Sequence, residues 1–106
     1  MVTVRTMPEG EVYHDVKLSH GEKFKIELKS EPSTGYRWHL LLFDQNALNL
    51  LSSEYVSLFA NQIVGVGVEH FSFEATTKGK TKVKMVYKRS WEKDQIKFNE
   101  FLIDVL

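Results

Sequence analysis

The amino-acid sequence predicts an all-β fold, either a sandwich or a barrel, on three observations. Several runs alternate apolar and polar residues, as strands do when one face is buried and the other is solvated. Short turn-forming segments separate these runs at frequent intervals. The dominant period is two residues rather than that of a helix, so we expect no long helix.

The first half of the chain predicts four strands. Residues 2–6 are expected to form an extra edge strand, and residues 11–18 the first strand of the main fold. The turn "SHGE" leads to a strand at 22–29, whose alternate apolar residues are Phe24, Ile26 and Leu28. The segment "EPSTG" separates it from a strand at 36–43, where we expect Trp38 to pack between two sheets.

The second half predicts four more elements after a less regular segment. Residues 44–56 ("DQNALNLLSSEYV") are expected to hold a short helical turn, with a strand at about 54–59. The strand expected at 69–76 places on one side Phe71, Phe73 and Ala75. After the turn "TTKGK", the strand expected at 80–88 carries on one side Val83, Met85 and Tyr87, and lysines opposite. The last strand is expected at 96–105.

Length and charge limit the classes of protein. We expect residues 1–106 to form one domain with its own core, and a monomer when free. Lys plus Arg (14) balances Asp plus Glu (14), so we expect no nucleic-acid partner. The lysine-rich run 78–89 leaves heparin or nucleic-acid binding as a minor alternative to a solvated strand face. No apolar run is long enough to span a membrane, and we expect no membrane partner.

The sequence offers little catalytic chemistry. The chain contains no cysteine, which excludes disulfides, a catalytic thiol and a thiolate metal site. The four histidines lack zinc-site spacing, and we expect no metal and no cofactor. Ser33, a histidine and Asp44 could form the residue set of a hydrolase. However, the segment "EPSTG" is not a nucleophile elbow, so we expect no catalytic residues. The N-terminus has no signal-peptide pattern, but a mature form would not have one either, so the compartment stays open.

Three connections stand out chemically. An antiparallel sandwich puts alternate connections at the same end, which predicts that the segments 31–36, 61–71 and 87–92 emerge together. The opposite end is expected to carry mainly polar turns. This contrast between the ends points to a functional surface.

The first of these connections reads as a rigid tip. Pro32 fixes its own φ, and Gly35 permits a positive φ. Ser33 and Thr34 can hydrogen-bond nearby backbone groups and hold the bend. The segment is therefore either a shaped contact surface or simply a connector.

The other two connections each leave two interpretations open. In "IVGVGV" (63–68), the valines are interleaved with glycines, which is typical of a strand that bulges into the core or of an apolar finger that enters a partner's pocket. Trp91 follows Arg89 in a charged, turn-like segment. Either it folds back onto the sandwich, or it is an exposed binding anchor, as Trp and Arg often are.

Taken together, the three segments resemble the motifs of the chagasin-type inhibitors of papain-like cysteine peptidases. Those motifs are Asn-Pro-Thr-Thr-Gly-Tyr/Phe, Gly-x-Gly-Gly and Arg-Pro-Trp/Phe. Here they read "EPSTGY" (31–36), "GVGV" (65–68) and "RSW" (89–91), in the same order and at fitting spacing. The strands between them cover nearly the whole chain.

Four positions depart from the family pattern. Glu31 replaces the asparagine, and Ser33, which keeps a hydroxyl, replaces the first threonine. Val68 replaces the last glycine and restricts the backbone. Ser90 replaces the proline, so the ring that would stiffen its loop is missing.

The resemblance implies an immunoglobulin-like antiparallel β-sandwich of about seven or eight strands and a wedge of three loops. It implies that the first loop approaches the catalytic Cys–His pair, the second lies along the substrate groove and the third grips the other wall. The peptidase-binding residues that it implies are Pro32, Ser33, Thr34, Gly35, Tyr36, Val64, Gly65, Val66, Gly67, Val68, Arg89, Ser90 and Trp91.

The sequence thus predicts a reversible, competitive inhibitor of papain-like, cathepsin L-like cysteine peptidases that is not itself an enzyme. The alternative is an immunoglobulin-like adhesion or ligand-binding module that uses the same loops on a different surface. The sequence does not identify the target peptidase.

Overall fold

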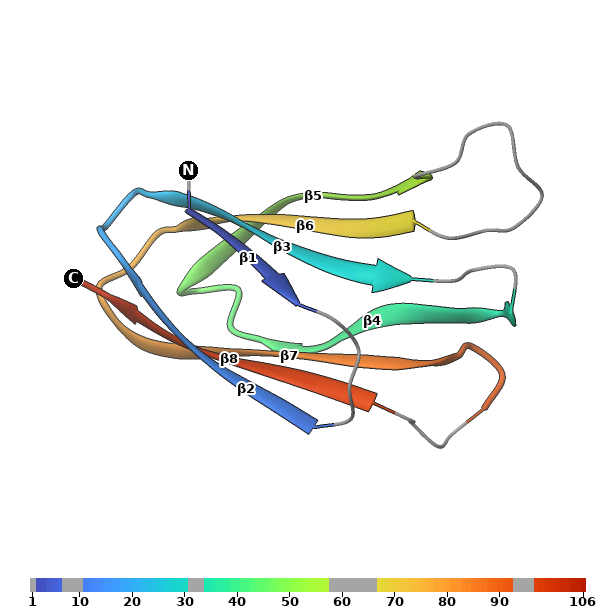
Figure 1. Cartoon of the computed structure of the whole chain (residues 1–106). Helices are drawn as coiled ribbons and strands as arrows, with labels where there is room; N and C mark the ends of the chain where they lie inside the picture. Colours follow the sequence, from blue (N-terminus) through green and yellow to red (C-terminus); the bar gives the residue numbers. More distant parts are fainter. Residues whose placement is uncertain (1, 7–10, 31–33, 58–66, 93–96) are drawn as a thin grey trace.

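The computed structural model describes residues 2–6, 11–30, 34–57, 67–92 and 97–106, and it shows two β-sheets packed face to face (Figure 1). The strands are β1 (Val2–Thr6), β2 (Glu11–Leu18), β3 (Lys23–Ser30), β4 (Tyr36–Phe43), β5 (Leu48–Ser57), β6 (Gly67–Ala75), β7 (Gly79–Arg89) and β8 (Lys97–Val105). One sheet has the order β1-β3-β6-β5 and the other β2-β8-β7-β4. The predicted all-β sandwich is confirmed.

The core lies between the sheets and follows the predicted alternation. On β3 the alternate residues Phe24, Ile26 and Leu28 are fully buried. The predicted inward residues of β6 and β7 are buried too, and Phe24 and Phe73 stack with ring centroids 5.2 Å apart. Each such large apolar side chain contributes about 1.5–3 kcal/mol on burial. The sequence pattern therefore fixes which face of each strand turns inward.

Strand direction alternates along the chain, so the odd-numbered strands run one way and the even-numbered strands the other. Because β1 neighbours β3 and β2 neighbours β8, these two pairs are parallel. The predicted antiparallel sandwich therefore carries one parallel pair at an edge of each sheet. We call the end where β3, β5 and β7 finish and β4, β6 and β8 begin the loop end (Figure 1, right).

The segment before β5 holds a single turn, followed by a longer strand than predicted. In the turn at residues 44–47, the Asp44 carbonyl accepts from the N–H groups of Ala47 at 3.1 Å and Leu48 at 3.0 Å, so the expected short helical turn is present as one turn that does not continue. Strand β5 already begins at Leu48, not near residue 54. Its register with β6 shifts between Leu50 and Ser52, and this bulge breaks the period of two on which the prediction depended.

Trp38 lies between the sheets, as predicted, and is 4% exposed. Its indole N–H donates to the Lys29 carbonyl on β3 at 3.0 Å. Its backbone N–H donates to the buried carboxylate of Glu69 on β6 at 2.9 Å. Two hydrogen bonds therefore join β4 to the opposite sheet close to the loop end.

Within the described residues, no helix has the length and apolar character needed to cross a membrane.

Candidate functional site

The described residues of the predicted site lie at the loop end, where β3 is followed by β4, β5 by β6 and β7 by β8 (Figure 1). The predicted residues that the structure describes there are Thr34, Gly35, Tyr36, Gly67, Val68, Arg89, Ser90 and Trp91. The predicted residues that lie outside the described part are Pro32, Ser33, Val64, Gly65 and Val66. The hairpin ends of β5–β6 and β7–β8 belong to different sheets, and the β3–β4 ends lie between them in the view.

Arg89, at the end of β7, links two of the predicted segments. It pairs with Tyr36 in the β4–β7 register. Its Nε donates a hydrogen bond of 3.1 Å to the carbonyl of Thr34. Its guanidinium carbon lies 4.4 Å from the centroid of the Tyr36 ring, within cation–π range. The base of the β7–β8 connection is therefore attached to the β3–β4 connection.

The residues after Arg89 form a tight turn. The Glu92 N–H donates to the Arg89 carbonyl at 3.1 Å, and Arg89 Nη1 donates to the Glu92 carboxylate at 3.1 Å. Trp91 sits in this turn with 71% of its surface exposed. Trp91 is therefore exposed and is not folded back onto the sandwich, and its role as a binding anchor stays a prediction.

Gly35 meets Trp91 across the two segments. The φ of Gly35 is +85°. This is the positive φ that the sequence analysis expected a glycine to permit. A Cβ at this position would lie 2.7 Å from Cη2 of Trp91, closer than real Cβ atoms come. The backbone conformation therefore favours glycine here, and an added Cβ would push the exposed indole ring out of its observed position.

The last two residues of the predicted glycine-rich finger belong to a strand and not to a loop. Gly67 and Val68 belong to β6, and Gly67 is buried. A Cβ on Gly67 would collide with the Val56 carbonyl and lie 2.6 Å from the Tyr55 ring. Packing within this chain therefore explains why position 67 is glycine.

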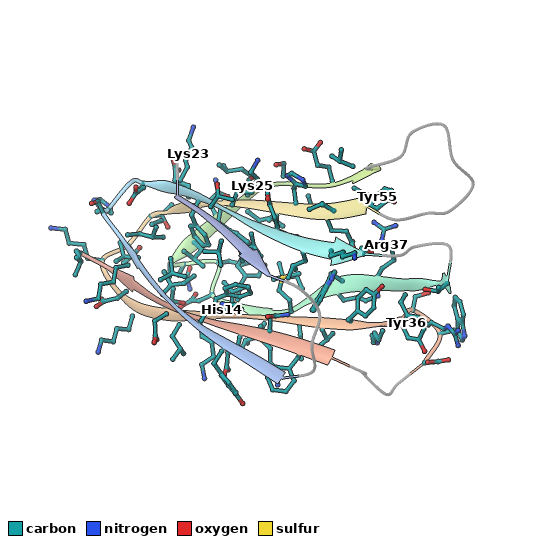
Figure 2. All side chains as sticks on the ribbon, in the orientation of Figure 1. His14, Lys23, Lys25, Tyr36, Arg37 and Tyr55 are labelled. Carbon is teal, nitrogen blue, oxygen red and sulfur yellow. The ribbon has the colours of Figure 1, made fainter. Side chains whose placement is uncertain are left out.

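Three residues that support the loop end were not singled out from the sequence. Arg37 donates from Nε to the Glu69 carboxylate at 3.1 Å, and its guanidinium carbon lies 5.6 Å from the Tyr55 ring centroid. Figure 2 shows Tyr36, Arg37 and Tyr55 near the loop end, whereas Lys23 lies at the opposite end. Arg37 and Glu69 are 32 residues apart in the sequence and lie on different strands, so their pairing leaves no local sequence pattern.

Aromatic rings continue from the site into the core. Tyr36 stacks on Tyr87 with centroids 5.6 Å apart, and Tyr87 meets Trp38 at 5.0 Å. In the described part of the chain, no group of three or more His, Cys, Asp or Glu residues is placed to hold a metal ion. The site therefore offers a shaped, aromatic contact surface on a rigid base.

The model of the family described as "Chagasin family peptidase inhibitor I42" matches residues 17–105 of the chain. The chain belongs to the chagasin family. A comparison with curated protein sequences finds no match.

Solved structures agree with the chagasin fold. The cysteine protease inhibitor EhICP2 from Entamoeba histolytica superposes with a TM-score of 0.78 at 21% identity, covering 94% of this chain and 97% of that one. The solution structure of Amebosin gives a TM-score of 0.71 at 25% identity, covering 93% and 99%. PbICP-C, solved in complex with falcipain-2, gives 0.73 at 15% identity, covering 99% and 98%. The predicted immunoglobulin-like sandwich of the chagasin type is confirmed.

Proposed function

We propose that this chagasin-family protein is a reversible, competitive inhibitor of papain-like cysteine peptidases and has no catalytic activity of its own. The observation that carries the proposal is the exposed Trp91 ring packed against Gly35 at the loop end. Family membership supports it, and so does the fold neighbour PbICP-C, which was solved in complex with falcipain-2.

The three segments divide the peptidase cleft between them in this proposal. Ser33, Thr34 and Gly35 approach the catalytic Cys–His pair and block it. Gly65 and Val66, flanked by Val64 and Val68, run along the substrate groove, where the valines offer apolar surface to a pocket, and the buried Gly67 lies at the base of this segment where β6 begins. Trp91 rests on the opposite wall of the cleft. Pro32, Tyr36 and Ser90 complete the contact surface.

Rigid loops make such an interface strong. An interface of about 800 Å² on each partner gives affinities that depend on anchor quality and on preorganisation. Here the loop end is braced by the hydrogen bond from Arg89 to Thr34 and by the aromatic row beneath Tyr36. Less conformational entropy is then lost on docking, because these contacts already hold the described residues Thr34 to Tyr36 and Arg89 to Glu92 before a partner binds.

The inhibitor resists cleavage in this proposal because it presents a bend and not an extended peptide. Attack by the catalytic thiolate needs an aligned carbonyl within about 3.5 Å. The positive φ of Gly35 turns the chain at the point where a substrate would continue straight.

Titration of active papain and of a cathepsin L-like peptidase with the protein tests the proposal. We expect KM for a small fluorogenic substrate to rise with inhibitor concentration while kcat stays constant, and activity to return on dilution. Mass spectrometry of the mixture is expected to show an intact inhibitor. Absence of inhibition at micromolar concentration would favour the adhesion-module alternative, and prompt cutting at residues 31–36 would contradict the blocking mechanism.

A further inference from the structure

Arg89 is occupied within its own chain. Its Nε donates to the Thr34 carbonyl, its Nη1 donates to the Glu92 carboxylate, and its guanidinium carbon lies over the Tyr36 ring. Only about a third of its side chain is exposed. A guanidinium has five N–H donors in a fixed plane, so both hydrogen bonds and the stacking orient it toward its own loops.

The same side chain touches both parts of the contact surface. The Thr34 carbonyl that it binds directly precedes Gly35, and Gly35 lies against the Trp91 ring. The guanidinium carbon is also 5.9 Å from the centroid of that ring. Thr34, Gly35, Tyr36, Trp91 and Glu92 therefore surround Arg89, and we call this arrangement the Arg89 clasp.

We propose that Arg89 is a positioning residue, which holds the Thr34–Gly35 bend and Trp91 in one arrangement before a partner binds. This part of the proposal concerns the free protein and does not depend on the proposed function. Resting on the proposed function, it further means that Trp91, and not the guanidinium, makes the decisive contact with the peptidase. In this proposal Arg89 acts within its own chain, in place of the direct grip on the peptidase that the resemblance implies.

The clasp also gives Ser90 an explanation. Proline at this position would fix φ and stiffen the turn by itself. In this chain the turn is held by other means, namely the Glu92 N–H to Arg89 carbonyl bond and the Arg89 to Glu92 side-chain bond, both 3.1 Å. Side-chain contacts of Arg89 thus take over a constraint that a proline ring would supply.

NMR of the free protein tests the clasp without any peptidase. The Trp91 ring lies beside Gly35, with its Cη2 2.7 Å from the position that a Cβ would take, so its ring current is expected to shift the Gly35 Hα resonances in the wild type. Trp91→Ala gives the position of these resonances without the ring. In Arg89→Ala and Arg89→Lys they are expected to move most of the way to that position, because a lysine ammonium lacks the planar fork. Unchanged Gly35 resonances in both Arg89 variants would overturn the clasp.

A double-mutant cycle on the inhibition constant tests the division of roles. Arg89→Ala is expected to weaken inhibition about ten- to a hundredfold, the range of a hydrogen bond from a charged group. If Arg89 acts through Trp91, the variant with both residues changed to alanine falls short of the product of the single effects by at least about fivefold. Effects that multiply would show that Arg89 does not act through Trp91, and would overturn the proposal.

The kinetics give a second readout. Loss of positioning lowers the fraction of molecules that can bind, so Arg89→Ala is expected to slow association and leave dissociation nearly unchanged. Loss of a direct contact would mainly speed dissociation. Lys80→Ala, which removes the same charge at the far end of β7, is the matched control and is expected to change neither rate more than about twofold.

The outcomes separate this inference from the proposed function. If the wild type does not inhibit papain-like peptidases, the proposed function fails while the NMR comparison still decides whether the clasp exists. If the wild type inhibits and the cycle is multiplicative, only the positioning role fails. Melting temperatures of all variants are measured beside these readouts, and Arg89→Lys serves if Arg89→Ala does not fold.

Discussion

The carboxylate of Glu69 on β6 accepts a 2.9 Å hydrogen bond from the backbone N–H of Trp38 on β4, across the gap between the two sheets. Among the described strands, β4 is an edge strand whose neighbour is β7, so no described strand lies on its other side to bind this N–H. Glu69 is 3% exposed, and its other oxygen accepts from Arg37. A buried charge therefore fastens the sandwich directly behind the loop end.

Glu69→Ala is expected to lower the free energy of unfolding by about 1–3 kcal/mol, because it leaves the Trp38 N–H buried without an acceptor. Urea unfolding followed by fluorescence measures this loss. Glu54→Ala, on the exposed surface of β5, is the control and is expected to change stability by less than about 0.5 kcal/mol. Equal stability of the two variants would mean that Glu69 does not fasten the sheets.

Trp91→Ala is expected to weaken inhibition by about 1–3 kcal/mol, the range of a well-placed aromatic anchor, and to leave the melting temperature unchanged. The ring is 71% exposed, so its removal opens no cavity in the core. Trp38→Ala is the contrast, since that ring is 4% exposed and its loss is expected to cost about 3–5 kcal/mol of stability. A sharp fall in melting temperature for Trp91→Ala with inhibition intact would show that Trp91 serves the fold instead.

Gly35→Ala is expected to weaken inhibition, because a Cβ would displace the Trp91 ring. Gly21 offers a matched control, since its φ is also +85° and a Cβ there meets nothing within 4 Å. Both variants therefore carry the same backbone strain of about 1–2 kcal/mol in folding stability. Only Gly35→Ala is expected to raise the inhibition constant, and equal inhibition by both variants would remove the role assigned to the Gly35–Trp91 contact.

Gly67→Ala is expected to destabilise the fold by about 1–3 kcal/mol, the usual cost of forcing extra volume into a packed site. The added Cβ would press on the Val56 carbonyl and the Tyr55 ring across the β5–β6 pair. Chemical denaturation measures the loss, and a shifted Tyr55 ring signal in NMR would locate it. An unchanged unfolding midpoint would show that β5 moves aside at no cost.

Local sequence patterns predict the elements whose burial is regular. In β3, β6 and β7, alternate residues face the core, so the period of two is visible and the predicted strands lie within one or two residues of those observed. The pattern fails in β5, where a bulge breaks the alternation and Leu50 and Leu51 are exposed. The parallel edges also escaped prediction, because which strands become neighbours is decided by packing of the whole sandwich and not by any one segment.

The candidate site was predictable as a set of residues and not as a set of contacts. The exposed Trp91 and the positive φ of Gly35 agree with what residue type and turn chemistry suggest. The intrachain role of Arg89 and the support from Glu69 depend on contacts between residues 55 and 31 positions apart, respectively. Such pairs carry no periodic signal, so only the folded chain brings them into view.

The C-terminal residue hydrogen-bonds back to the turn at the other pole of the sandwich: the Leu106 N–H donates to Leu18, and its carbonyl accepts from His20. The last strand thus delivers the end of the chain to the pole opposite the loop end (Figure 1, left). A cargo fused there, or a surface to which the protein is tethered there, would leave Trp91 and its neighbours pointing outward. A group attached at Leu106 would therefore be separated from Trp91 by the length of the sandwich.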